Sequence, residues 1–267
     1  MPQSKLNDPQ YLEKQYKDSS NLDARVRLHQ RFSVNKYGWH RWVFDQFKLP
    51  ARCRILELGC GPGYLWLANL DRIPAGWEIS LSDFSSGMLE QTRQNLMDKP
   101  GFQYECFSAQ SIPFEDEHFD VVIANHMLYH VADKAAAFAE IRRVLKPGGY
   151  FFASTVGGGH LREMADLLCK FDEKLISWGS VTDSFTLENG MAQLAGQFTK
   201  IKLTRYEDAL EVTEVTALVD YFLSGWIQQI LEKRLDAFRL LVENEMEARG
   251  GVIHISKESG LFISSPK

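Results

Sequence analysis

Apolar and polar positions along the chain follow two patterns, one typical of strands and the other of helices. Strand patterns occupy five short segments, 55–58, 77–83, 102–107, 119–125 and 150–155. Helical patterns fill the intervals between them, most clearly from Lys134 to Leu145, with Asp133 as N-cap and Pro147 beyond the end. This regular alternation between residues 51 and 155 predicts a parallel sheet with helices on both faces.

The first of these strand segments leads directly into a glycine-rich turn. Ile55–Leu58 is followed by Gly59-Cys60-Gly61-Pro62-Gly63, and an apolar helical pattern begins at Tyr64. Strand, glycine turn and helix, in this order, present backbone N–H groups to a nucleotide-like ligand. Each glycine removes a Cβ where the backbone must approach a ligand or take a positive φ.

Asp83 ends the second strand segment, twenty residues after Gly63. That is about the separation at which a Rossmann-like unit places an acid on the ribose of its ligand. A carboxylate can accept hydrogen bonds from both vicinal hydroxyls. The alternative is an acid that caps the helix beginning at Ser85–Met88, and both roles can coexist. We favour ligand binding because the glycine turn precedes Asp83 at the right distance.

The chain after residue 156 predicts further helices and late strands. Helical patterns cover 160–176, 187–194 and 213–249, the last broken near Gly225. Strand patterns cover 198–206, 252–256 and 261–264. The last two flank the turn Lys257-Glu258-Ser259-Gly260, as in a hairpin.

Residues 25–42 mix basic and aromatic side chains. Such a mixture can grip an anion or a flipped base. It also suits a helical lid whose rings pack on the core while its charges stay in water. We favour the lid because the chain as a whole is acidic. The helical pattern continues to Pro50, so residues 1–50 predict an N-terminal helical lid.

The composition is that of a globular protein, 45% hydrophobic and 24% charged, with a net charge of -5. This charge argues against a broad nucleic-acid surface. The four cysteines have neither CxxC nor metal-ligand spacing, which is typical of free thiols in a reducing compartment. The sequence contains no apolar run long enough to span a bilayer and no apolar signal-peptide core, so we expect a cytoplasmic protein.

Five motifs occur in order between residues 51 and 156. They are Glu57-Leu58-Gly59-Cys60-Gly61-Pro62-Gly63, Ser82-Asp83-Phe84-Ser85, Ile112-Pro113-Phe114, Phe119-Asp120-Val121-Val122 and Arg143-Val144-Leu145-Lys146-Pro147-Gly148-Gly149. The ordered set resembles that of class I S-adenosylmethionine-dependent methyltransferases, especially the methyltransferase type 11, or UbiE-like, small-molecule branch. One glycine turn is a weak signal, whereas five motifs in order are a strong one.

The resemblance implies an α/β fold. It is a Rossmann-like, doubly wound, mostly parallel seven-stranded sheet with an antiparallel C-terminal hairpin and helical lid insertions. We assign 198–206 and the hairpin to the end of that sheet. Residues 51–267 would form the methyltransferase domain, with substrate caps at 157–196 and 207–249 that, together with the N-terminal lid, roof the donor. Candidate walls of the acceptor pocket, or ordinary core residues, are Trp178, Tyr221, Phe222 and Trp226.

The same resemblance implies S-adenosyl-L-methionine as methyl donor and S-adenosyl-L-homocysteine as product. Gly59, Gly61 and Gly63, with Cys60, would face the methionine moiety. Glu57 would stabilise the turn or meet the donor's amino group through water.

The remaining donor contacts follow from the later motifs. Asp83 would hold the ribose hydroxyls, with Phe84 and Met88 flanking the adenine. The adenine would also be lined by Ser108, Ala109 and Gln110. Many relatives carry an acid at the position of Ser108. Asn125 would lie beside the sulfonium and the acceptor.

Methyl transfer from a sulfonium is an in-line SN2 displacement with a good leaving group. The protein must align donor and acceptor, exclude water and deprotonate a hydroxyl or amine acceptor. His126 and His130 are the nearest candidate bases, although either could be a wall or helix-start residue. We expect no metal, because the H-E-x-x-H carboxylate is missing and no third ligand is evident.

Two missing motifs narrow the possible classes of methyl acceptor. The loop at Asn125–Leu128 lacks the Asn/Asp-Pro-Pro-aromatic motif of exocyclic-amine methylation, and no Pro-Cys pair offers a nucleophile for pyrimidine methylation. We therefore expect a methyltransferase acting on a small molecule, with the acceptor atom (O, N or C) and the oligomeric state left open. The alternatives are an RNA or protein methyltransferase using the basic N-terminal segment, and a donor-binding regulatory protein without catalysis.

Overall fold

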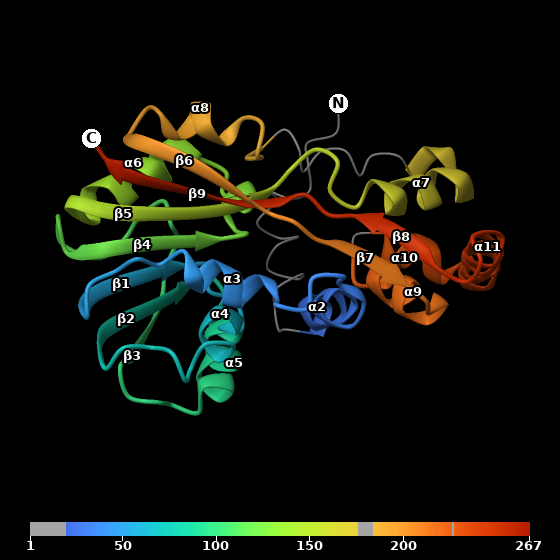
Figure 1. Cartoon of the computed structure of the whole chain (residues 1–267), viewed down its shortest axis with the longest axis horizontal. Helices are drawn as coiled ribbons and strands as arrows, with labels where there is room; N and C mark the ends of the chain where they lie inside the picture. Colours follow the sequence, from blue (N-terminus) through green and yellow to red (C-terminus); the bar gives the residue numbers. More distant parts are fainter. Residues whose placement is uncertain (1–19, 176–183, 226) are drawn as a thin grey trace.

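The computed structural model describes residues 20–175, 184–225 and 227–267 (Figure 1). Its centre is a seven-stranded sheet of order β3-β2-β1-β4-β5-β9-β6. The strands are β1 (Arg52–Leu58), β2 (Gly76–Asp83), β3 (Phe102–Cys106), β4 (Phe119–Asn125), β5 (Leu145–Val156), β6 (Phe198–Tyr206) and β9 (Ser259–Pro266). β1 to β5 are parallel, and β9 runs antiparallel to both β5 and β6. The predicted fold class is confirmed.

Helices cover both faces of this sheet (Figure 1). One face packs against α3 (Trp39–Asp45), α4 (Tyr64–Leu67) and α5 (Ser86–Leu96), and the other against α6 (Lys134–Val144) and α8 (Gly190–Leu194). Successive side chains of a strand point to opposite faces, so Ile55 joins the first core and Leu56 the second. Burial on both faces explains the apolar run Val121–Ala124 of β4.

Side-chain caps begin two of the helices. The Asp133 carboxylate accepts the Ala136 N–H at 3.0 Å at the start of α6, as predicted. The Ser85 hydroxyl accepts the Met88 N–H at 3.3 Å at the start of α5. Each bond satisfies one of the N–H groups that a helix start leaves without an intrahelical partner.

A second layer of elements has its own apolar core. It contains a two-stranded antiparallel sheet, β7 (Ala209–Val212) and β8 (Ile253–Ser256). Its helices are α2 (Ser20–Phe32), α7 (Arg162–Phe171), α9 (Val215–Leu223), α10 (Gln228–Glu232) and α11 (Leu235–Ala248). Leu210, Phe222 and Phe238 are fully buried in this core. Within this layer, α2 lies on the side toward the main sheet (Figure 1).

The predicted hairpin of 252–256 and 261–264 is wrong. β8 pairs with β7, while β9 enters the main sheet between β5 and β6. Pairing of β8 with β7 buries the side chains of Ile253 and Ile255 in the core of the second layer. The antiparallel pair at the end of the main sheet is therefore β6 with β9, and the segment 207–249 begins with a strand.

Two predicted helical segments are also divided differently. Residues 213–249 break near Gly225 as expected, but they form three helices because the chain turns again between α10 and α11. The basic and aromatic segment 25–42 is interrupted between α2 and α3, where Gly38 has a φ of 91°. This turn lets α3 pack on the main sheet while α2 packs on the second layer.

The chain crosses between the two sheets twice, and a buried ion pair joins the crossings. Lys257 binds Asp208, and their side chains are only 8% and 1% exposed. Asp208 also accepts the Ser33 hydroxyl at 2.7 Å and the Asn35 N–H at 3.0 Å. One carboxylate therefore ties three separate chain segments together.

We predict that Asp208→Asn lowers the free energy of unfolding by about 3 kcal/mol, because it leaves the Lys257 charge buried without its partner. Asp208→Asn combined with Lys257→Met should lose less than Asp208→Asn alone. Chemical denaturation of the three proteins measures both effects.

The matched control is Asp71→Asn, which removes an exposed carboxylate 3.7 Å from Arg41. Exposed pairs contribute little, so this variant should lose less than about 1 kcal/mol. Equal losses for Asp71→Asn and Asp208→Asn would contradict the proposed importance of burial.

Candidate active site

The glycine turn lies after β1, at the edge of the sheet where the parallel strands end. Gly59, Gly61 and Gly63 have φ values of 62°, 54° and 76°, a region that L side chains rarely adopt. A Cβ on Gly59 would lie 2.8 Å from the Met127 Cβ, and one on Gly63 would lie 2.7 Å from the Thr92 Cγ2. Conformation and space both require glycine at these two positions.

Asp83 fastens this turn to β2. Its carboxylate accepts the Gly61 N–H at 3.0 Å and the Ser85 N–H at 2.9 Å. Thr92 of α5 adds a bond from its hydroxyl to the Gly61 carbonyl. Since the Ser85 side chain caps α5, Asp83 is not the capping residue. Burial raises the pKa of Asp83, which is 6% exposed.

Glu57 lies buried beneath the turn, 2% exposed. The Trp66 indole N–H donates to its carboxylate at 2.6 Å. Burial raises the pKa of Glu57 to about 8, and the charge of Asp83 adds to the shift. Glu57 therefore carries a proton at neutral pH, and its position fits support of the turn.

The residues predicted for the adenine lie where β2 and β3 end. The Phe107 N–H donates to the Asp83 carbonyl at 3.2 Å, which brings the segment beginning at Ser108 beside Phe84. Phe84 is 46% exposed, whereas Met88 and Ala109 are buried. The Gln110 side chain accepts the Asp133 N–H at 3.1 Å, and the Ser108 hydroxyl accepts the Gln110 N–H at 3.2 Å. Their adenine contacts stay predictions.

Asn125 and His126 lie at the end of β4, next to the turn. The Ser154 hydroxyl donates to the Asn125 side-chain oxygen at 2.6 Å and accepts the His126 N–H at 2.9 Å. The Trp39 indole N–H donates to the same Asn125 oxygen at 3.2 Å. His126 has a φ of 54°, and its ring centroid lies 4.8 Å from that of Trp39.

The electrostatics of His126 favour its neutral form. Burial, with smaller contributions from His160, His40 and Lys257, lowers the pKa of His126 to about 3. His130, the other candidate base, ends the short 3₁₀ turn Leu128–His130 and packs edge-to-face on Tyr129. Neither base role is tested by these contacts.

Ser154 and Trp39 are site residues that sequence reasoning missed. Ser154 faces Asn125 because these two residues are paired in the register of β4 and β5. Only that register, not the spacing along the chain, would have identified Ser154. Of the four candidate walls, Phe222 is fully buried core and Tyr221 lies near His29. Trp178 and Trp226 lie outside the residues that the structure describes.

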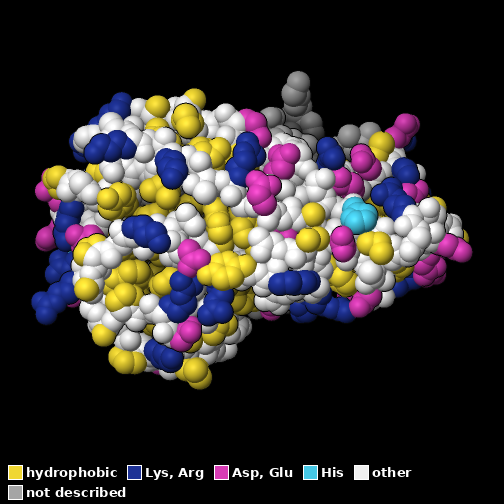
Figure 2. Space-filling view, viewed as in Figure 1, with side chains coloured by type: hydrophobic (Ala, Val, Ile, Leu, Met, Phe, Trp, Pro, Cys, Tyr) yellow, Lys and Arg dark blue, Asp and Glu magenta, His cyan; other side chains and the backbone are white. Residues whose placement is uncertain are grey.

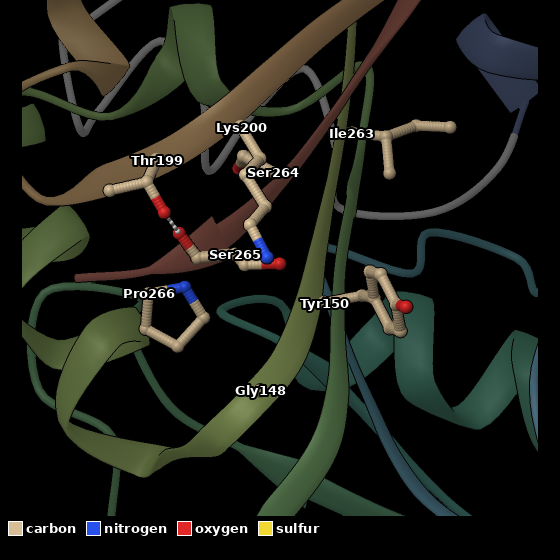
Figure 3. Close-up of a pocket in the computed structure, with 8 residues that line it drawn as sticks. All are labelled: Gly148, Tyr150, Thr199, Lys200, Ile263, Ser264, Ser265 and Pro266. Carbon is tan, nitrogen blue, oxygen red and sulfur yellow. Dashed lines mark hydrogen bonds between the residues drawn. The ribbon is translucent and has the colours of Figure 1, made fainter.

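A shallow pocket of about 300 Å³ occurs elsewhere on the main sheet (Figure 3). It is lined by Gly148, Tyr150, Thr199, Lys200, Ile263, Ser264, Ser265 and Pro266. Gly148 and Tyr150 belong to the first half of β5, whereas the glycine turn lies where the parallel strands end. This pocket therefore does not contain the candidate site.

Comparisons with known proteins agree with this geometry. Residues 56–153 match a family model described as a methyltransferase domain. The ubiquinone/menaquinone biosynthesis C-methyltransferase UbiE of Xanthomonas oryzae pv. oryzae is 33% identical over 115 residues, which cover 42% of this chain and 46% of that protein. Its counterpart in Shewanella piezotolerans is 32% identical over 114 residues, covering 42% and 45%.

Solved structures share the fold. The YcgJ protein of Bacillus subtilis has a TM-score of 0.59 at 16% identity, covering 85% of this chain and 97% of that one. Phosphoethanolamine N-methyltransferase 2 of Haemonchus contortus, solved with phosphomonomethylethanolamine and S-adenosylhomocysteine, has a TM-score of 0.60 at 21% identity, covering 100% and 61%.

The sheet order and the glycine turn at its edge define a class I, S-adenosylmethionine-dependent methyltransferase fold. Residues 56–153 match the model of the methyltransferase domain family, the family that the ordered motifs resemble. The chain spans about half the length of the curated relatives it matches.

We predict that Gly63→Ala costs about 2–4 kcal/mol of stability, from the left-handed backbone and the contact with Thr92. Gly148→Ala is the matched control, since Gly148 has a φ of 78° and open space around it. It should cost only about 1 kcal/mol. Thermal and chemical unfolding measure both.

Thr92→Ser separates the two causes, because it removes the clashing methyl and keeps the hydroxyl. In that background, Gly63→Ala should cost about as much as Gly148→Ala does in the wild type. An unchanged cost would show that the contact with Thr92 is not the cause.

We also predict that Glu57 makes stability depend on pH. Its pKa rises from 4.5 in the unfolded chain to about 8, so its contribution is fully present below the lower value and is lost as pH rises through the upper. Glu57→Gln cannot ionise and should reduce the loss between pH 5 and 8 by about 2–4 kcal/mol. Glu78→Gln, at an exposed position on β2, should leave the slope unchanged. Equal slopes for Glu57→Gln and wild type would exclude this role.

Proposed function

We propose that the protein transfers a methyl group from S-adenosyl-L-methionine to a small-molecule acceptor by in-line SN2 displacement. The observation that carries the proposal is the turn of three positive-φ glycines whose middle residue, Gly61, donates its N–H to the buried carboxylate of Asp83. These residues come from two neighbouring strands, and they meet where open α/β sheets bind their ligands.

In this proposal the glycine turn holds the methionine end of the donor. The turn lies close to α2: a Cβ built on Gly61 would be 3.7 Å from the Leu22 Cδ2 atom. Asp83 accepts the ribose hydroxyls with the carboxylate lone pairs that Gly61 and Ser85 leave free. The exposed ring of Phe84 stacks on the adenine.

The acceptor side uses the residues after β4. Asn125 is oriented by Ser154 and Trp39 from two different elements, which suits alignment of a reacting group. His126 and His130 stay the candidate proton acceptors. Within 20–175, 184–225 and 227–267, no three His, Cys, Asp or Glu side chains could hold a metal ion.

The contacts of the basic N-terminal segment favour a small acceptor over RNA. Arg25 donates to the Ser224 carbonyl at 2.8 Å, Arg31 pairs with Glu214, and Arg41 lies 3.7 Å from Asp71. These cations have partners within the molecule, although Arg31 and Arg41 are exposed. On the face shown in Figure 2, basic and acidic side chains are interspersed, which does not suit a polyanion.

We further propose a cytoplasmic location. All four cysteines are free thiols, as expected in a reducing compartment. In the described part of the chain, no helix combines the length and the apolar character needed to cross a membrane.

Calorimetry with S-adenosylhomocysteine tests the donor site. We expect binding by the wild type and at least a tenfold weaker affinity for Asp83→Asn, since hydrogen bonds to a charged group contribute about 1.5–3 kcal/mol. Asp71→Asn, an exposed acid elsewhere, should bind like the wild type. Thermal unfolding of each variant shows whether the turn itself survives.

Two outcomes would defeat the proposal. Absence of S-adenosylhomocysteine binding by the folded wild type removes the donor. Donor binding without turnover, across a panel of hydroxyl, amine and carbon acceptors, would instead identify a regulatory protein. Release of S-adenosylhomocysteine in the presence of one panel member is the expected result.

A further inference from the structure

Three histidines from distant parts of the chain gather beside the end of β4. His29 belongs to α2, His126 follows β4, and His160 lies in the turn after β5. The ring centroids of His29 and His160 are 6.4 Å apart, with the rings nearly parallel at 27°. His126 is close enough for its charge to act on both of the others. His29 and His160 form no part of the site predicted from sequence.

Each of these histidines has lost its ordinary tendency to be charged. Burial lowers the pKa of His29, His126 and His160 to about 3. All three are therefore neutral at physiological pH. The three side chains are half-buried, and one of them can take up a proton at this pH only if something stabilises the charge.

The hydrogen bonding of the cluster is incomplete. Within the described residues, the His29 Nδ1 has no hydrogen-bond partner, although it is shielded from solvent. A buried polar atom without a partner is unfavourable, so a ligand that supplies the partner is stabilised. The His160 Nδ1 accepts the Glu258 N–H at 3.1 Å. A neutral imidazole with an accepting Nδ1 carries its proton on Nε2, so His160 offers a donor.

The charged groups around the cluster are basic or already paired. Lys257 from the crossing before β9 supplies positive charge, and Tyr221 of α9 packs edge-on to His29 at 6.2 Å. The nearest carboxylates are occupied, because Asp208 binds Lys257 and Glu258 accepts the Gly159 N–H at 3.0 Å. Lys257 and the neutral imidazoles therefore favour an anionic ligand over a cationic one.

We propose that His29 and His160, beside His126, form an oxyanion subsite, which binds a carboxylate or phosphate group of the methyl acceptor. This inference rests on the proposed function, because it assigns the acceptor end of the same site. The oxyanion supplies the missing partner of His29 and accepts from His160. Its negative charge offsets the cost of protonating an imidazole, so binding is coupled to proton uptake.

Three probes that share one aromatic ring test the charge requirement: benzoate, phenyl phosphate and benzyl alcohol. Each is titrated by calorimetry into the full chain, with and without S-adenosylhomocysteine. We expect at least one of the two anions to bind about tenfold or more tightly than the alcohol, and more tightly at about pH 6 than pH 8. Comparison of benzoate with phenyl phosphate identifies which oxyanion is preferred.

His29→Gln and His160→Gln should each weaken binding of the anion about tenfold or more and leave benzyl alcohol unaffected. His254→Gln is the matched control, since its side chain is 72% exposed on β8. If a variant unfolds, NMR of the histidine rings in the wild-type protein tests the oxyanion subsite instead. Anion binding should raise the pKa of His29 and His160 in the wild type.

The two proposals fail in different ways. Failure of S-adenosylhomocysteine to bind, while an anion still binds through His29 and His160, removes the methyl donor and keeps the oxyanion subsite. Anions that bind no more tightly than benzyl alcohol to a protein that does bind S-adenosylhomocysteine overturn the oxyanion subsite alone. Unchanged histidine signals on saturation with both anions overturn it as well.

Discussion

The turn between β1 and α4 depends on backbone conformations that only glycine adopts at little cost. Gly59, Gly61 and Gly63 all have positive φ, and two of them also lack room for a Cβ. The atoms that would clash, in Met127 and Thr92, belong to the loop after β4 and to α5. The turn thus sets how closely these neighbours approach, and the donor and acceptor sides of the site are positioned by one short backbone segment.

Burial then determines the charge state of the site. It raises the pKa of Glu57 and Asp83 and lowers the pKa of His29, His126 and His160, because a desolvated group of either kind resists ionisation. Glu57 and the three imidazoles are therefore neutral near pH 7. A sulfonium donor would favour ionisation of the carboxyl groups, whereas an anionic acceptor would favour protonation of the imidazoles.

The second layer connects this site to the rest of the chain. α2 contributes His29 and passes close to Gly61, while its end is joined to Asp208 through Ser33. Asp208 and Lys257 hold the crossings between the two sheets. Stability of the crossings and placement of α2 over the turn are thus coupled, so the helical layer acts as part of the site.

Local patterns along the sequence determined the central fold and the donor turn. β1 to β5 follow from short strand patterns that alternate with helical ones, and the spacing from the glycine turn to Asp83 identified two features that meet through the Gly61 N–H. These features depend on neighbours in sequence or on one βαβ unit. Only tertiary structure decided three other features. β8 pairs in the second layer, Asn125 pairs with Ser154, and His29, His126 and His160 lie together. They depend on register and on packing between residues far apart in the chain, which no local pattern records.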